Sequence, residues 1–309
     1  MTDPGAQPVG AGPATAPPVE AGSAASLEQP AWIPRSGGDL FAVVTRPPGA
    51  PGLVAVLHSG GHGLTAHHRN GMYVRMARAL AGAGVASIRF DYQGVGESGG
   101  STKQRFLLER PARDDTLAVV EWARGEGFQR FALVGSCFGA RTALAAAPAV
   151  EGLEALVLLA PPVRDVQSVK TADTLTITGG LRRALRADVL RRLTERKRRE
   201  RYLGLARARL TGRAGPRARG SASPAFRTPL AAVAERGIPT LVAYGAGDTY
   251  HDQWERAAGA DLAPVLARAG DRLQVQLADT HLHGFTSLAV QDWTVATTVA
   301  WLADRAAAR

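Results

Sequence analysis

The sequence predicts an α/β fold built on a mostly parallel, doubly wound sheet. From Ala31 onward, short apolar runs alternate with stretches of helical periodicity, and several of the runs are almost continuous Val, Leu, Ile and Ala. Alternation of strand and helix is typical of a parallel sheet covered by helices. Continuous apolar strands are expected where both faces of a sheet are buried.

Seven runs have the length and composition of strands. They are Leu40–Thr45, Leu53–His58, Ala86–Asp91, Phe131–Gly135, Leu156–Ala160, Thr240–Tyr244 and Leu273–Leu277. Apolar residues at helical spacing predict four helices between or after them, at Gly71–Gly82, Arg113–Arg124, Ala140–Ala147 and Trp293–Ala307. The second of these helices begins with two aspartates, which the helix dipole favours in a first turn.

Two segments do not follow this alternation of strands and helices. Residues 1–30 are rich in Ala, Gly and Pro, and we expect them to be a disordered arm because such a composition cannot offset its ordering entropy. After Pro161-Pro162 an arginine-rich helical stretch interrupts the strands. We expect residues 163–230 to form a helical cap inserted into a single domain of residues 31–309. An insertion at the carboxyl ends of parallel strands lies over the ligand crevice.

The net charge of +10 arises in the predicted cap. Between Leu181 and Gly220 there are 14 arginines and one lysine against three acidic residues, whereas the rest of the chain has 22 basic and 24 acidic residues. By default such a helix is a solvated surface stabilised by charge pairs. The alternative is a lid that attracts an anionic substrate or an acidic carrier protein. Only Tyr202 interleaves with this charge, so we expect no nucleic-acid partner.

The single cysteine, Cys137, excludes an internal disulfide and a multi-cysteine metal site. No apolar run reaches the roughly 18 residues needed to span a bilayer, and the N-terminus lacks the basic-then-apolar order of a signal peptide. We therefore expect a cytoplasmic protein with no membrane partner. His62, His67 and His68 crowd one loop, but no acidic residue or cysteine accompanies them at ligand spacing, so no metal site is predicted.

The strongest local signal is Gly135-Ser-Cys137-Phe-Gly139, which follows an apolar strand and opens a helix. A strand, a G-x-nucleophile-x-G turn and a helix form a nucleophile elbow. Glycines fit there because flanking side chains would collide in so sharp a turn. Ser136 is the alternative nucleophile, but it lies one position before the centre of the bracket formed by Gly135 and Gly139. The other reading of Cys137 is a buried packing residue.

An acid and a histidine follow in the order that this elbow requires. Asp248 and His283 each lie just past the carboxyl end of a predicted strand, after the cysteine in the chain. Three alternatives lie close to them: His281 and Asp279 are in the same turn as His283, and Asp252 is near Asp248. The pattern predicts that a nucleophile, an acid and a histidine meet at one edge of the sheet.

In these residues the chain resembles the α/β-hydrolase superfamily. The resemblance extends from about Ala31 to the carboxyl terminus, apart from the predicted cap. Two further segments carry the resemblance. His58-Ser-Gly-Gly61 is similar to the family's oxyanion loop, and Asp91-Tyr-Gln-Gly94-Val-Gly96-Glu-Ser98 is similar to its D-x-x-G-x-G-x-S turn. Cysteine at the elbow is similar to the dienelactone-hydrolase branch and to certain hydrolases of bacterial exosortase clusters.

The resemblance implies a Cys-His-Asp triad. In such a triad His283 takes the proton of Cys137 while Asp248 orients the imidazole. The backbone N–H groups of Phe138 and Gly60 would bind the oxyanion of the intermediate. A thiol at a helix N-terminus beside an imidazolium is expected to have a lowered pKa.

The implied activity is hydrolysis of an ester, lactone or thioester of a small-molecule acyl compound, without a cofactor. Because a thioester retains acyl-transfer potential, acyl transfer or elimination on a biosynthetic intermediate is the first alternative. Ligand binding without turnover is the second. Four residues beside the nucleophile are expected to contact the substrate: Ser59, Gly61, His62 and Ser136. The sequence leaves the oligomeric state open.

Overall fold

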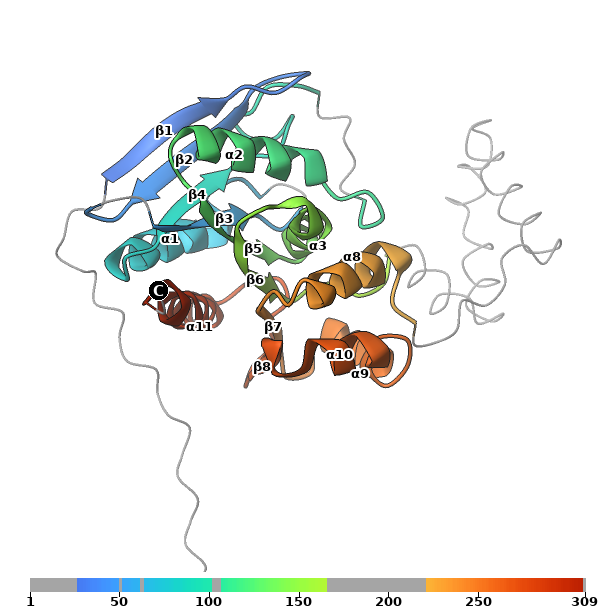
Figure 1. The fold of residues 1–309 in the computed structure, drawn as a ribbon. Coiled ribbons are helices and arrows are strands. Elements are labelled where there is room, and N and C mark those ends of the chain that lie inside the picture. Colours follow the sequence, from blue (N-terminus) through green and yellow to red (C-terminus); the bar gives the residue numbers. More distant parts are fainter. Residues whose placement is uncertain (1–26, 50–51, 62–63, 102–106, 166–220, 308–309) are drawn as a thin grey trace, which may run out of the picture.

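The computed structural model of the chain describes five stretches: residues 27–49, 52–61, 64–101, 107–165 and 221–307. They form an eight-stranded sheet with helices on both faces (Figure 1), which confirms the predicted α/β class. The first 26 residues of the expected arm lie outside the described residues. Most of the expected cap, residues 166–220, also lies outside them.

Seven strands coincide with the predicted runs to within a few residues. They are β2 (Leu40–Arg46), β3 (Leu53–His58), β4 (Ala86–Phe90), β5 (Arg130–Ser136), β6 (Leu153–Leu159), β7 (Thr240–Gly245) and β8 (Leu273–Ala278). The sheet order is β1-β2-β4-β3-β5-β6-β7-β8, and β3 to β8 run parallel to one another. β2 is antiparallel to both of its neighbours.

The eighth strand, β1 (Leu27–Ile33), was not predicted, and its first four residues fall in the interval 1–30 that was expected to be a disordered arm. Its composition is poor for a strand, and Pro30 is tolerated because β1 lies at the edge of the sheet. Glu28 forms an ion pair at 2.9 Å with the buried guanidinium of Arg89. Pairing with β2 and this ion pair stabilise a strand that local composition does not specify.

Helices cover both faces of the sheet. On one face α1 (Met72–Gly82) and α11 (Leu288–Ala307) lie side by side. The other face carries α2 (Arg113–Gly125), α3 (Phe138–Ala146) and α8 (Pro224–Glu235). The short helices α9 (Thr249–Ala258) and α10 (Ala263–Ala269) connect β7 to β8. Among the described residues, no helix is both long enough and apolar enough to cross a bilayer.

Three helices, α8, α9 and α10, were not predicted. α8 begins with Pro224 and contains Pro229, which weakens its helical signal, and the first half of α9 is mainly polar. The first residues of α8 also fall in the interval 163–230 expected to form the cap. Because α8 packs on α3, this part belongs to the helical layer on the sheet.

Both faces of the central strands are buried. Every residue of β3, β4 and β7 is buried, and successive residues of β3 alternate between two apolar clusters. Val54 and Val56 face the cluster that includes α2 and α3, whereas Ala55 and Leu57 face the cluster that includes α1 and α11. This double burial explains the nearly continuous apolar runs in the sequence.

A buried arginine in α3 links the segment that follows β6 to the segment that precedes α8. Arg141 of α3 has no exposed surface and donates hydrogen bonds to the carbonyls of Pro162 and Leu108. It also bonds to Ser223 Oγ and forms an ion pair with Asp165, each at 3.0 Å. These contacts offset the cost of removing the guanidinium charge from water.

We expect Arg141→Ala to lower the free energy of unfolding by about 3–5 kcal/mol, because it removes the ion pair with the partly buried Asp165 and the donor to several buried acceptors. The matched control is Arg130→Ala, which removes a partly exposed ion pair with Glu154 and should cost about 1 kcal/mol or less. Urea denaturation followed by circular dichroism measures both. Equal losses would contradict the role of Arg141.

Candidate active site

The turn between β5 and α3 has the geometry of a nucleophile elbow. Cys137 has φ 50° and ψ −112°, a conformation that non-glycine residues rarely adopt. Its N–H donates to the carbonyl of Leu159 at 2.8 Å, and its carbonyl accepts from the N–H of Arg141. The sheet and the first turn of α3 therefore hold Cys137 at the carboxyl edge of the strands.

The two glycines of the bracket are there for steric reasons. A Cβ at Gly135 would collide with the backbone of Gly139. A Cβ at Gly139 would collide with the carbonyls of His58 and Ser59. The strand, the elbow and the loop after β3 thus approach one another more closely than side chains permit.

The loop after β8 brings a histidine to the cysteine. His283 is partly buried, and its Nε2 lies 4.0 Å from Cys137 Sγ. Such distances in free enzymes often shorten when a substrate binds. This arrangement can transfer a proton between the thiol and the imidazole.

Asp248 lies after β7 and is fully buried, but it contacts the histidine loop differently from the expected triad. Its carboxylate accepts the backbone N–H groups of Gly245, Leu282 and His283 at 2.9–3.2 Å. Its Oδ1 also lies 2.7 Å from Nδ1 of His281.

Within the described chain, the ring of His283 makes no hydrogen bond with Asp248. The expectation that Asp248 directly orients this ring is corrected, because His281 lies at Oδ1 of the carboxylate. Asp248 instead fixes the backbone on which His283 stands.

Burial controls the protonation of the cysteine and the histidine. It raises the pKa of the Cys137 thiol, and hydrogen bonds from the Phe138 N–H and the Tyr250 side chain offset only part of that rise. Burial also lowers the pKa of His283, although Asp248 acts in the opposite direction. The expectation of a lowered thiol pKa is therefore wrong, and the resting pair is a neutral thiol beside a neutral imidazole.

Tyr250, in the first turn of α9, is a site residue that the sequence did not reveal. Its side chain hydrogen-bonds to Cys137, and its ring lies edge-on to that of His283 with centroids 4.4 Å apart. Burial beside Cys137 raises the pKa of the Tyr250 hydroxyl, so it remains a proton donor. Its position two residues after Asp248, at the start of a helix, was the available signal.

The residues expected to form the oxyanion hole lie beside the nucleophile. The backbone N–H of Phe138 lies close enough to the Cys137 sulfur to favour the thiolate. Gly60 lies against the elbow, where an added Cβ would be 3.5 Å from the Cβ of Cys137. A Cβ at Gly61 would likewise meet the side chain of Phe138.

Two of the residues expected to contact substrate are unavailable to it. Ser59 is buried and its hydroxyl donates to the carbonyl of Leu64, while Ser136 is fully buried and bonds to His68 Nε2 at 3.0 Å. These hydroxyls stabilise loops behind the elbow, so the expectation is corrected for both, and Ser136 is not accessible as a nucleophile. His62 lies outside the described residues.

Buried histidines near the site are structural. His58 bonds to Val134 and Thr116 through its two ring nitrogens, and burial lowers its pKa to about 4. Burial also lowers the pKa of His68 to about 4. In the part of the chain that the structure describes, no group of three His, Cys, Asp or Glu side chains is placed to bind a metal ion.

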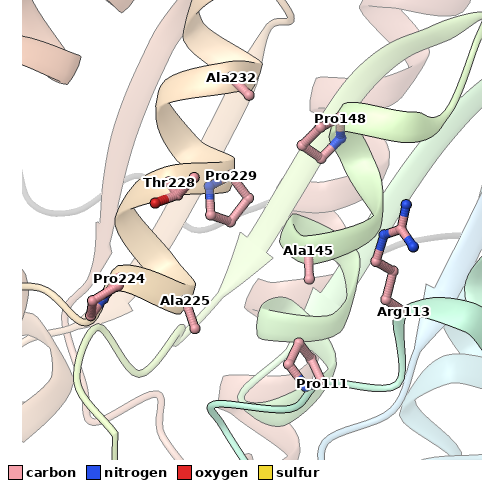
Figure 2. Close-up of a pocket in the computed structure, with 9 residues that line it drawn as sticks. All are labelled: Pro111, Arg113, Ala145, Pro148, Pro224, Ala225, Thr228, Pro229 and Ala232. Carbon is pink, nitrogen blue, oxygen red and sulfur yellow. The ribbon is translucent and has the colours of Figure 1, made fainter.

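A separate apolar groove of about 420 Å³ lies between α3 and α8 (Figure 2). Ala145 and Pro148 line one side, and Ala225 and Pro229 of α8 line the other. Cys137 and His283 do not line it. Because its walls carry no nucleophile or base, this groove is distinct from the candidate active site.

The protonation state can be tested by alkylating Cys137 with iodoacetamide across a pH series. We expect the rate to rise with a midpoint above the value of about 8.5 for a free thiol, because burial disfavours the thiolate. Tyr250→Phe should move the midpoint higher, since it removes a hydrogen bond that favours the thiolate. A plateau of fast alkylation near pH 6 would instead indicate a thiolate–imidazolium pair.

Comparison with solved structures supports the fold. The chain resembles a dienelactone hydrolase from Anabaena variabilis, with 14% identity, a TM-score of 0.54 and coverage of 90% of this chain and 97% of that one. It also resembles Est1E from Butyrivibrio proteoclasticus, solved with ferulic acid, with 17% identity, a TM-score of 0.55 and coverage of 90% and 100%. A brefeldin A esterase of bacterial origin gives 20% identity, a TM-score of 0.56 and coverage of 97% and 81%.

Comparison with protein families identifies the sequence more directly. No curated protein matches the chain. The profile of one family, described as serine aminopeptidase S33, matches residues 54–284, a span that includes the elbow, Asp248 and His283. The family description refers to serine, whereas the residue at the centre of the elbow in this chain is Cys137. The fold and this match show that the chain belongs to the serine aminopeptidase S33 family of α/β-hydrolases.

Proposed function

We propose that this chain is a hydrolase that cleaves a small-molecule ester, lactone or thioester through a covalent intermediate on Cys137. The observation that carries the proposal is the strained elbow, which presents a single thiol 4.0 Å from the imidazole of His283. Membership of an α/β-hydrolase family supports hydrolysis as the reaction class. The cysteine nucleophile is the specific part of the proposal.

In the first step, His283 Nε2 accepts the thiol proton as the Cys137 sulfur attacks the carbonyl carbon. A neutral thiol beside a neutral imidazole is suited to this step, because the proton moves only as the new C–S bond forms. The negative charge that develops on the carbonyl oxygen would be held by the N–H groups of Phe138 and Gly60. The imidazolium then donates its proton to the leaving oxygen or sulfur.

In the second step, water attacks the thioester with His283 as the base. The proton of that water passes to Nε2, the tetrahedral intermediate collapses, and the C–S bond breaks as the proton returns to the Cys137 sulfur. The product is a carboxylic acid, and the enzyme regains its resting protonation. No cofactor enters this cycle.

Asp248 is a positioning residue in this proposal. It accepts the backbone N–H of His283 and lies close enough for its charge to raise the pKa of the imidazole. It therefore acts on the histidine through the loop and through its charge. Its contact with His281 restrains the same loop from the solvent side, where the His281 side chain is 57% exposed.

Tyr250 is well placed to assist the nucleophile. Its hydrogen bond to Cys137 favours the thiolate over the thiol, and its ring packs on His283. As the thiol proton passes to His283, the hydroxyl can stabilise the negative charge that develops on the sulfur. This contact helps to explain how a partly buried cysteine with a raised pKa remains reactive.

The two histidines can be separated by their effects on hydrolysis of p-nitrophenyl acetate. His283→Gln should lower kcat/KM by about 10²–10⁴-fold, because it removes the general base. His281→Gln should lower it less than about tenfold, because the polar contact of this exposed side chain is with Asp248 and not with Cys137. Cys137→Ala should reduce turnover to the background rate.

Circular dichroism should show that all three variants remain folded. A loss in His281→Gln as large as that in His283→Gln would move the base to His281. Retention of turnover by folded Cys137→Ala would remove the cysteine from the mechanism.

A further inference from the structure

The two edges of the sheet differ in how they are protected. β1 at one edge contains Glu28 and Pro30, and proline and charge are devices that prevent edge strands from pairing with other chains. β8 at the other edge reads Leu273-Gln-Val-Gln-Leu-Ala278 and contains neither proline nor a charged residue. Among the described strands, β8 pairs only with β7. No described segment occupies its outer edge, which can therefore pair with another strand.

β8 also has side chains that are largely exposed. Its four central residues are all exposed, including Val275 at 40% and Leu277 at 49%. Both are on the same face of the strand, since side chains alternate along it. An edge strand without charge and with exposed aliphatic side chains tends to pair with another strand, because pairing removes these side chains from water.

The sequence of β8 identifies the partner. Leu273-Gln274-Val275-Gln276-Leu277 reads the same in both directions. In antiparallel pairing about a two-fold axis at Val275, each Val275 faces its copy, each Leu273 faces Leu277 and each Gln274 faces Gln276. On one face of the sheet every pair is then apolar with apolar, and on the other face every pair is amide with amide.

We infer that β8 pairs antiparallel with β8 of a second copy of this chain, joining the two sheets across a two-fold axis. Such an interface is isologous, with the same patch contributed by both copies. Pairing satisfies backbone groups along the open edge and buries Val275 and Leu277. The proposal does not depend on the proposed activity.

Pairing would also reach the candidate active site. The loop that carries His281 and His283 begins directly after β8. In the antiparallel arrangement, this loop in one copy lies beside the start of β8 in the other. The interface would therefore hold in place the strand end from which the histidine loop leaves.

The inference can be tested by sedimentation velocity on the full chain from about 1 to 100 μM. We expect a concentration-dependent dimer, and Leu277→Lys should raise the dimer Kd at least tenfold, because it places a charge in the strand pair. The matched control is Leu27→Lys at the opposite edge, where the leucine is 54% exposed. It should change Kd less than twofold.

A monomer at 100 μM would overturn the inference, and so would a dimer that Leu277→Lys leaves intact. Circular dichroism of both lysine variants excludes unfolding as the cause of a change.

Disulfide cross-linking tests the register, and the single native cysteine allows a clean background. In Cys137→Ala, we expect Val275→Cys to form a disulfide-linked dimer on mild oxidation, because opposed residues in antiparallel strands have Cα atoms about 4.5–5.5 Å apart. Gln274→Cys should cross-link with Gln276→Cys when the two variants are mixed, and neither should cross-link efficiently alone. A dimer in which Val275→Cys fails to cross-link would overturn the proposed pairing.

Discussion

The sharp turn at Cys137 is the constraint on which the site depends. A non-glycine residue at positive φ costs of the order of 1–3 kcal/mol, so it persists only where the surrounding structure enforces it. Here β6 accepts the Cys137 N–H, and α3 donates to its carbonyl. Gly135 and Gly139 allow the backbones to meet. Doubly buried parallel strands supply the rigidity that this turn needs.

Burial of the same turn determines the chemistry available to the cysteine. It raises the pKa of Cys137 and lowers that of His283, so both groups are neutral at rest. In the proposed mechanism, proton transfer and nucleophilic attack then occur together, unlike in a site that stores a thiolate. Tyr250 partly offsets the effect of burial, because its side chain lowers the pKa of the thiol.

The sequence predicted the parts of the molecule that depend on local pattern. Continuous apolar runs predicted the seven strands from β2 to β8, and the bracket of Gly135 and Gly139 predicted the turn. β1 was missed because its stability comes from pairing with β2 and from the ion pair of Glu28 with Arg89. Helices α8, α9 and α10 were missed because prolines or polar residues obscure their periodicity.

Contacts within the site were harder to predict, since they depend on how loops meet. Periodicity cannot show that Asp248 contacts the ring of His281 and the backbone of His283, because both histidines leave the same strand. It also cannot show that Ser136 is bonded to His68, or that Tyr250 contacts Cys137. Each of these contacts joins segments that are distant in the chain. Which of the two histidine rings meets the carboxylate also depends on side-chain rotamers.

The central claim is that Cys137 forms a covalent acyl intermediate. Intact-protein mass spectrometry after brief exposure to an activated acyl ester, followed by peptide mapping, tests it most directly. The account predicts one acyl group per chain, located on Cys137 and absent from Cys137→Ala. An acyl group on another residue, or turnover without any adduct on Cys137 when deacylation is slowed at low temperature, would contradict it.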